Sequence, residues 1–63
     1  MKNNVKELRK ARGLRQEDLA AALDVTRQTI IAIENNKYDP TLELAMRLSA
    51  FFGVSVNDMF TIE

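Results

Sequence analysis

The sequence predicts one all-α domain of five short helices, spanning residues 1–63. Apolar residues recur at helical spacing along nearly the whole chain, and the breaks in this spacing fall at Gly13, Pro40 and Gly53, residue types that interrupt helices. A chain of 63 residues buries only about 60% of the surface that its unfolded form exposes. Because the chain contains no Cys, no disulfide supplements the core, and packing of its 46% hydrophobic residues has to supply the stability.

The first helix is expected over about residues 4–12. Val5 and Leu8 begin an apolar stripe at helical spacing, and either of two preceding Asn residues can cap the amino end. Gly13 follows the last turn, where a left-handed residue is favoured. The pattern therefore indicates a short helix with a defined stop.

The second helix is expected over about residues 16–23, where Leu19 and Leu23 lie on one face. Two acidic residues occupy its first turn, where the helix dipole favours negative charge. Arg15 stands at the N-cap position and is a poor capping residue, because its side chain carries no hydrogen-bond acceptor.

The third helix is expected over about residues 27–35. Only Asp24-Val25-Thr26 separates it from the second helix, and Ile30 and Ile33 then resume the helical period. Thr26 is a good N-cap. Two helices joined by so short a turn are expected to cross at a steep angle.

Residues 35–40 form the clearest loop, ending in Asp39-Pro40. Thr41 then caps a longer fourth helix, which ends before Gly53. Its main apolar stripe is expected to consist of Leu42, Ala45, Leu48, Ser49 and Phe52.

The fifth helix is expected to be only a turn or two long, from Ser55 to near Phe60, with Ser55 and the acidic residue three positions later forming a capping-box pattern. Residues 61–63 have a strand-like composition. We expect residues 1–3 and 61–62 to pair as a short two-stranded ribbon that joins the termini.

The charges balance but are unevenly distributed. Nine Lys and Arg oppose nine Asp and Glu, yet the first sixteen residues contain six of the positive charges and one negative charge, a net of +5 that leaves −5 for the remainder. Such a split is typical of a polyanion-facing end, or of a solvated helix face in a neutral protein. The charge distribution alone favours the second interpretation.

Composition also excludes several classes of function. The chain has no His and no Cys, so the usual general base, thiol nucleophile and transition-metal ligands are missing, and neither an enzyme nor a metal or other cofactor is expected. No apolar run approaches the 18 or so residues of a membrane span, and the charged amino terminus lacks a signal-peptide pattern. We therefore expect a cytoplasmic protein without a membrane partner.

The second and third helices form a helix-turn-helix arrangement, whose second helix suits the DNA major groove. With Arg27 placed at 0°, Ile30 and Ile33 fall at about 300° and 240°. The opposite face, between about 40° and 140°, contains Gln28, Ile31, Ala32 and Asn35. Arg and Gln side chains can make paired hydrogen bonds to guanine and adenine edges respectively, and apolar side chains can contact thymine methyl groups.

The run from Gln16 to Asn35 resembles the helix-turn-helix of the Cro/C1-type repressors, the XRE family. Leu8 with Arg12-Gly13-Leu14 matches the lead-in of that family, and residues 40–45 and 53–60 match its closing segments, so the resemblance covers essentially the whole chain. It implies a lambda-repressor-like fold. It also implies a small stand-alone repressor that binds double-stranded DNA operators as a homodimer.

The resemblance implies roles for individual residues. Ala20 would be the small residue where the two helices touch, and Val25, Ile30 and Ile33 would anchor the pair. The base-reading positions would be Arg27, Gln28, Ile31 and Ala32. Backbone phosphates would be contacted by Gln16, Thr26, Thr29, Asn36 and Lys37, and Gln16 would also steady the recognition helix.

Alternative interpretations apply to some of these positions. Arg27 and Gln28 could be solvated polar residues, and Thr26 and Thr29 could serve only in capping. Three residues depart from the family pattern: Asp24 replaces a common Gly, Arg15 replaces a Ser or Thr cap while bringing a cation near the phosphate path, and Ile31 replaces a residue that is often polar. At position 31 the apolar side chain would either restrict the preferred operator sequence to thymine at the contacted base or lie outside the groove.

A homodimer is expected because one recognition helix reads only a few base pairs. On the fourth helix, Leu44 and Phe51 lie about 100° from the middle of the predicted core stripe, so their apolar surface needs another partner. The candidates for the dimer interface are Phe51, Val56, Met59 and Ile62. Core packing under the fifth helix is the alternative for these side chains.

The sequence thus predicts a DNA-binding transcriptional regulator, a repressor on a palindromic operator. The alternative is a protein-interaction module, an adaptor or antitoxin-like protein that binds a partner through Leu44, Phe51 and Ile31. Salt separates the two, because DNA binding weakens steeply with ionic strength and an apolar contact does not. No small-molecule ligand is indicated.

Overall fold

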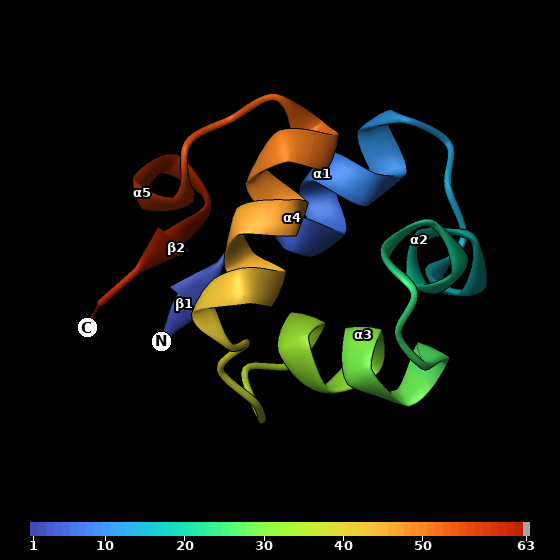
Figure 1. The fold of residues 1–63 in the computed structure, drawn as a ribbon, viewed down its shortest axis with the longest axis horizontal. Helices are drawn as coiled ribbons and strands as arrows, with labels where there is room; N and C mark the ends of the chain where they lie inside the picture. Colours follow the sequence, from blue (N-terminus) through green and yellow to red (C-terminus); the bar gives the residue numbers. More distant parts are fainter. Residues whose placement is uncertain (63) are drawn as a thin grey trace.

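The computed structural model describes residues 1–62, which form five helices and a two-stranded sheet. Figure 1 shows α3 lying across one side of the molecule and α4 standing upright beside it, with α1 and α2 completing the bundle. The predicted five-helix, mostly helical fold is therefore confirmed. In chain order the elements are β1 (Lys2–Asn3), α1 (Val5–Ala11), α2 (Gln16–Leu23), α3 (Arg27–Glu34), α4 (Leu42–Phe52), α5 (Val56–Met59) and β2 (Phe60–Thr61).

Side-chain caps and left-handed residues set the helix ends. The Thr26, Thr41 and Ser55 hydroxyls each accept the backbone N–H three residues ahead, at 3.1 to 3.2 Å. Gly13 and Gly53 adopt φ values of +67° and +69° just beyond α1 and α4. These positions match the predicted boundaries because the same residue types that stop a helix in sequence stop it in space.

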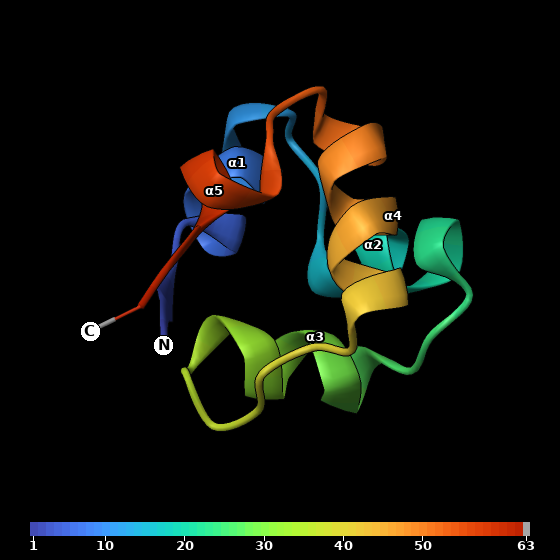
Figure 2. The same ribbon diagram turned by 60° about the vertical axis from the view of Figure 1, so that its left-hand side comes forward.

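A short ribbon joins the two ends of the chain. β1 pairs antiparallel with β2, with Lys2 opposite Thr61 and Asn3 opposite Phe60. The ribbon predicted from the sequence is confirmed, although the second strand begins one residue earlier than expected. In Figure 2 the dark-blue β1 and the red β2 lie near the end of α3.

The core is a single cluster to which every helix contributes. Its fully buried side chains come from α1, α2, α3, α4 and the end of α5, and α2 packs most extensively on α3. The buried apolar residues are Val5, Leu19, Ala20, Leu23, Ile30, Ile33, Leu44, Ala45, Leu48, Phe52, Met59 and Phe60.

Two predictions about the face of α4 are wrong. Leu42 was expected in the core but is 74% exposed, and Leu44 was expected to need a partner but is only 7% exposed. The cause is a rotation of α4 about its axis: Leu44, Ala45, Leu48 and Phe52 define the inward direction, and Leu42 lies well away from it. Leu44 is therefore removed from the alternative binding surface.

Met59 is also corrected as a candidate for the dimer interface, because it is 1% exposed and lies in the core. The short α5 turns back under the molecule, and the backbone N–H of Asn4 donates to the Met59 carbonyl at 3.1 Å, which draws this residue inward. Phe51 and Val56 are half-buried against the core, whereas Ile62 is exposed.

No helix within residues 1–62 is both long enough and apolar enough to cross a membrane.

Candidate nucleic-acid interface

The turn between α2 and α3 is tight and left-handed. Asp24 ends α2 with φ 57° and ψ 44°, a conformation that Asp tolerates better than most residues. The small Ala20 is buried where the helices meet, and Val25 is packed against the core. In Figure 1, α2 is seen nearly end on while α3 runs across the view, so the two helices cross steeply, as the short turn predicts.

The two faces of α3 differ as the helical angles predict. Ile30 and Ile33 are completely buried, whereas Gln28 is exposed on the opposite side and Arg27 is exposed at the edge of that side. Ile31 and Ala32 are half-buried on that outer side. The outward surface of α3 is thus free of the molecule's own core and begins with two side chains suited to base edges.

The hydroxyl groups at the start of α3 are bonded to one another. Thr26 Oγ1 accepts the Thr29 backbone N–H at 3.2 Å and lies 3.0 Å from Thr29 Oγ1. The capping role considered for these residues is therefore present. Thr26 is exposed and Thr29 is half-buried, so Thr26 is the better placed of the two to meet a phosphate.

Gln16 connects α2 to the end of α3. Its Nε2 donates to Glu34 Oε1 at 3.1 Å, which fits the expected steadying role. The same carboxylate accepts Arg9 Nε at 2.7 Å and Arg9 Nη2 at 3.2 Å, and Arg9 Nη1 donates to the Leu14 carbonyl at 2.8 Å. The hydrogen bond to Glu34 raises the pKa of Arg9 despite its burial.

The sequence-based reasoning missed this buried ion pair. Arg9 was counted only as part of the positive amino-terminal segment, yet its side chain is 10% exposed and that of Glu34 is 1% exposed. A signal existed, because Arg9 stands four residues after Val5 and so shares the apolar face of α1. A charge on a buried face requires a partner of opposite sign.

Part of the amino-terminal positive charge serves the fold. Besides Arg9, Arg12 donates to the Phe51 and Phe52 carbonyls at 2.8 and 3.1 Å and lies over both rings, 5.4 and 5.2 Å from their centroids. This places a cation at the negative end of α4. The guanidinium groups of Arg9 and Arg12 are therefore engaged inside the molecule, whereas Lys2, Lys6 and Lys10 are exposed.

Arg15 is held by an acidic neighbour at the start of α2. Asp18 Oδ2 accepts the backbone N–H of Arg15 at 2.9 Å and its Nε at 3.2 Å. These hydrogen bonds, first the backbone one and then the side-chain one, lower the pKa of Asp18. Asp18 thus makes one half of a capping box by accepting the N–H of the N-cap residue, and its carboxylate also binds the Arg15 guanidinium.

Asn36 and Lys37 follow α3 in the loop. Asn36 adopts a left-handed φ of 58°, and its Oδ1 accepts Asn3 Nδ2 at 3.1 Å. The same Asn3 amide donates to the Ile33 carbonyl at 2.9 Å, which ties β1 to the end of α3. The Lys37 side chain is exposed.

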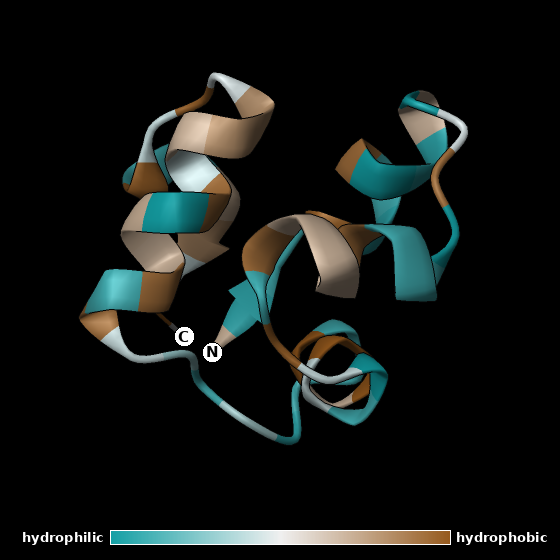
Figure 3. Ribbon diagram, turned by 45° about the vertical axis from the view of Figure 1, so that its right-hand side comes forward, coloured by the Kyte–Doolittle hydropathy of each residue, from teal (hydrophilic) through white to brown (hydrophobic). Residues whose placement is uncertain are grey.

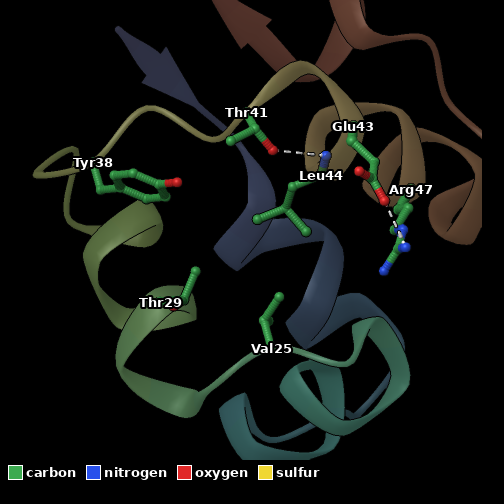
Figure 4. A pocket seen from close by; sticks show the side chains of 7 residues that line it. All are labelled: Val25, Thr29, Tyr38, Thr41, Glu43, Leu44 and Arg47. Carbon is green, nitrogen blue, oxygen red and sulfur yellow. Dashed lines mark hydrogen bonds and ion pairs between the residues drawn. The ribbon is translucent and has the colours of Figure 1, made fainter.

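A shallow pocket of about 280 Å³ lies between the start of α3 and the start of α4. Figure 4 shows the Tyr38 ring at one end and the Glu43 and Arg47 side chains at the other. Glu43 and Arg47 bind each other at 2.6 Å, so no free charge converges on the space. The pocket is lined by Val25, Thr29, Tyr38, Thr41, Glu43, Leu44 and Arg47.

The helix-turn-helix family pattern matches residues 5–59. The chain belongs to the Cro/C1-type (XRE) helix-turn-helix family. Proteins of this XRE type are DNA-binding transcriptional regulators and not enzymes. The match includes α1 to α5, so the predicted resemblance is confirmed over nearly the whole chain.

Two relatives in the XRE family align along the full chain. An uncharacterized HTH-type transcriptional regulator of Methanocaldococcus jannaschii, MJ0272, is 56% identical over 63 residues, which is 100% of this chain and 96% of the relative. YgzD, an uncharacterized HTH-type transcriptional regulator of Bacillus subtilis, is 46% identical over the same shares.

A solved structure supports the fold. The hypothetical transcription factor NHTF from Neisseria superposes with a TM-score of 0.78 at 25% sequence identity. The match covers 87% of this chain and 62% of that one, so NHTF is the longer protein. The arrangement of helices is thus shared beyond the closely similar relatives.

Proposed function

We propose that this protein is a repressor that binds a palindromic DNA operator as a homodimer, through the major groove. The observation that carries the proposal is the pair of opposed faces on α3: Ile30 and Ile33 are buried at 0% exposure, while Arg27 and Gln28 project into solvent. A helix anchored from behind presents its outer side chains in fixed positions, which sequence readout requires.

Base recognition is assigned to four residues on the outward surface of α3. Arg27 suits the O6 and N7 atoms of guanine, and Gln28 suits the N6 and N7 atoms of adenine. Ile31 and Ala32 are apolar and only half-buried, which suits contact with thymine methyl groups.

Phosphate contacts are assigned to residues that flank α3 at both ends. Thr26 caps its start, whereas Gln16 on α2 lies against its end, where Asn36 and Lys37 also follow. Arg15 and Thr29 are included with these. Like Gln16, Thr26 and Asn36, each already makes a side-chain hydrogen bond inside the molecule. Contacts of this kind fix the register of the protein on the duplex without reading sequence.

Repression follows from occupancy alone, because a protein bound over a promoter excludes polymerase without further chemistry. A homodimer follows from the small site that one recognition helix reads, since two half-sites about 34 Å apart multiply the discrimination. Such a regulator acts in the cytoplasm, where the DNA of a prokaryotic cell lies.

The test is selection of duplexes from a random pool, followed by binding measurements on the selected sequence. Arg27→Ala and Gln28→Ala are expected to cost about 1–3 kcal/mol each and to relax preference at single base positions. Asn57→Ala, an exposed change on α5, is the matched control and should bind as the wild type does. Equal losses on selected and random duplexes for Gln28→Ala would reject the assignment.

A further inference from the structure

The outer face of α4 exposes an apolar stripe that the fold leaves uncovered. Leu42 is 74% exposed, Met46 is 59% exposed and Ala50 is exposed one turn further along. These residues are four apart, so they span only about 80° around the helix. Leu44, Ala45, Leu48 and Phe52 point the other way, into the core. Large exposed apolar side chains that adjoin on one helix are typical of an interaction surface.

The direction of α4 decides what such a surface can meet. In Figures 1 and 2, α4 stands upright, with its amino end at the level of α3 and its carboxyl end away from it. Figure 3 shows α4 on one side of the molecule, at its edge. The outward surface of α3 faces DNA in the proposed function, so α4 points away from the duplex.

A symmetry axis that relates two DNA-bound copies must also point at the duplex. It therefore runs roughly along α4, and it brings a second α4 alongside in parallel. The symmetry axis lies half of the half-site spacing, about 17 Å, from each recognition helix. The domain measures 27 × 22 × 20 Å, so it is wide enough to reach from the recognition helix to the axis. A contact along the side of α4 is thus compatible with two recognition helices on successive turns of DNA.

We propose that the stripe of Leu42, Met46 and Ala50 is the homodimer seam, packed in parallel against the same stripe of a second copy with Met46 facing its counterpart at the centre. This inference rests on the proposed function, which supplies the direction of the symmetry axis. The partner is a second copy of this chain. In a symmetric parallel pair each residue of the stripe packs against the same residue of the other copy, and apolar side chains such as these three can do so.

The charges beside the stripe permit this packing. Glu43 and Arg47 lie on one flank and bind each other at 2.6 Å, with side chains that are 74% and 51% exposed. On the other flank stands Ser49, which is neutral. In a parallel pair the charged flank of one helix faces the neutral flank of the other, so no like charges meet.

The seam is short, and this sets its strength. An 11-residue helix is about 16 Å long, so the contact lies below the roughly 1,200 Å² of a standard interface. The free dimer is therefore weak and depends on protein concentration, and a duplex with two half-sites strengthens it by holding both copies together.

Introducing charges at Met46 tests the seam. Dimerisation is measured by sedimentation equilibrium without DNA, at several hundred micromolar protein. Met46→Glu and Met46→Lys should each weaken dimerisation by at least about tenfold, because two like charges then face each other. An equimolar mixture of the two variants should restore the dimer. Circular dichroism should show both variants folded, since the side chain is largely solvent-exposed.

Ile62→Glu is the matched control, because Ile62 is 88% exposed and was a candidate for the interface from the sequence. It should leave the dimer unchanged. A monomeric wild type, unweakened Met46 variants, a mixture that stays monomeric, or a dimer lost in Ile62→Glu would each overturn the proposal. Failure of the seam leaves base readout by Gln28 measurable on a single half-site, so the two proposals can fail separately.

Discussion

The Arg9 guanidinium meets the Glu34 carboxylate through two hydrogen bonds, Nε to Oε2 at 2.7 Å and Nη2 to Oε1 at 3.2 Å. The pair joins α1 to the end of α3, and Gln16 extends the connection to α2 through the same carboxylate. Both side chains are almost completely buried. The recognition helix is therefore fixed at its carboxyl end by charge, and along its inner face by Ile30 and Ile33.

Removing one partner of this pair should be severe. Glu34→Ala or Arg9→Ala removes one partner and leaves the other as a buried charge without a counter-charge. Each variant is expected to lower the free energy of unfolding by about 3–5 kcal/mol. Urea denaturation followed by circular dichroism measures the loss. The free energy of unfolding of so small a domain is only a few kcal/mol, so we expect the single variants to be partly unfolded at room temperature.

The double variant Arg9→Met with Glu34→Leu is the matched control for that prediction. It replaces both charges with apolar side chains of similar volume, so it should recover most of the stability lost in either single Ala variant. A double variant as unstable as the sum of the two single variants would show that the loss comes from packing, or from the Leu14 carbonyl and Gln16 amide that lose their partners, and not from an unpaired charge.

Asp24 offers a prediction of opposite sign. Its φ of 57° is costly for a residue with a Cβ, so Asp24→Gly should raise the free energy of unfolding by up to about 1 kcal/mol. Ala21→Gly, at an exposed position in the interior of α2, should lower it by about 1 kcal/mol. Thermal unfolding of both variants checks the contrast, and a loss in both would mean that the left-handed turn stores no strain.

The sequence predicts the local structure well and the long-range polar contacts poorly. Caps such as Thr26 and stops such as Gly13 act within one turn, so their effect can be inferred from neighbouring residues. The opposed faces of α3 are predictable for the same reason, since a helical angle depends only on spacing.

The missed features depend on where helices dock. The rotation of α4, which buries Leu44 and exposes Leu42, follows from its packing against the rest of the core, and α4 alone offers apolar residues in both directions. The partner of Arg9 lies 25 residues away and cannot be found from spacing on α1. Met59 is buried because the ribbon pulls α5 inward, which is again a contact distant in sequence.

Lys37 provides a test of the phosphate contacts. Its side chain is exposed in the loop after α3, so Lys37→Ala should weaken binding to selected and random duplexes by the same factor. The slope of log K against log salt should become shallower by about 0.9, the value for one lost phosphate contact. Fluorescence anisotropy between 50 and 200 mM salt, in the range where such slopes are resolved, measures both quantities. Lys6→Ala on α1 is the matched control and should leave the slope unchanged.

The pKa of Asp18 gives a pH prediction. Hydrogen bonds from the Arg15 backbone and side chain hold this pKa below its ordinary value in the folded state. A lowered folded pKa means that the stabilisation is present above the unfolded pKa and is lost as pH falls through the folded one. The advantage of wild type over Asp18→Asn in urea denaturation should therefore be constant near neutral pH and shrink below the ordinary Asp range. An advantage that grows on acidification would contradict the assignment.

The same contact makes Asp18 a restraint on DNA binding. Its carboxylate binds Arg15 through Nε at 3.2 Å and Nη2 at 3.4 Å, at the amino end of α2 where a phosphate would approach. Asp18→Asn removes a negative charge there and releases the guanidinium, so it should strengthen binding to every duplex and steepen the salt slope by about one phosphate contact. In the Arg15→Ala background the gain should be smaller, because no cation is left to release. Equal gains in both backgrounds would show that Asp18 acts by its own repulsion of DNA and not by holding Arg15.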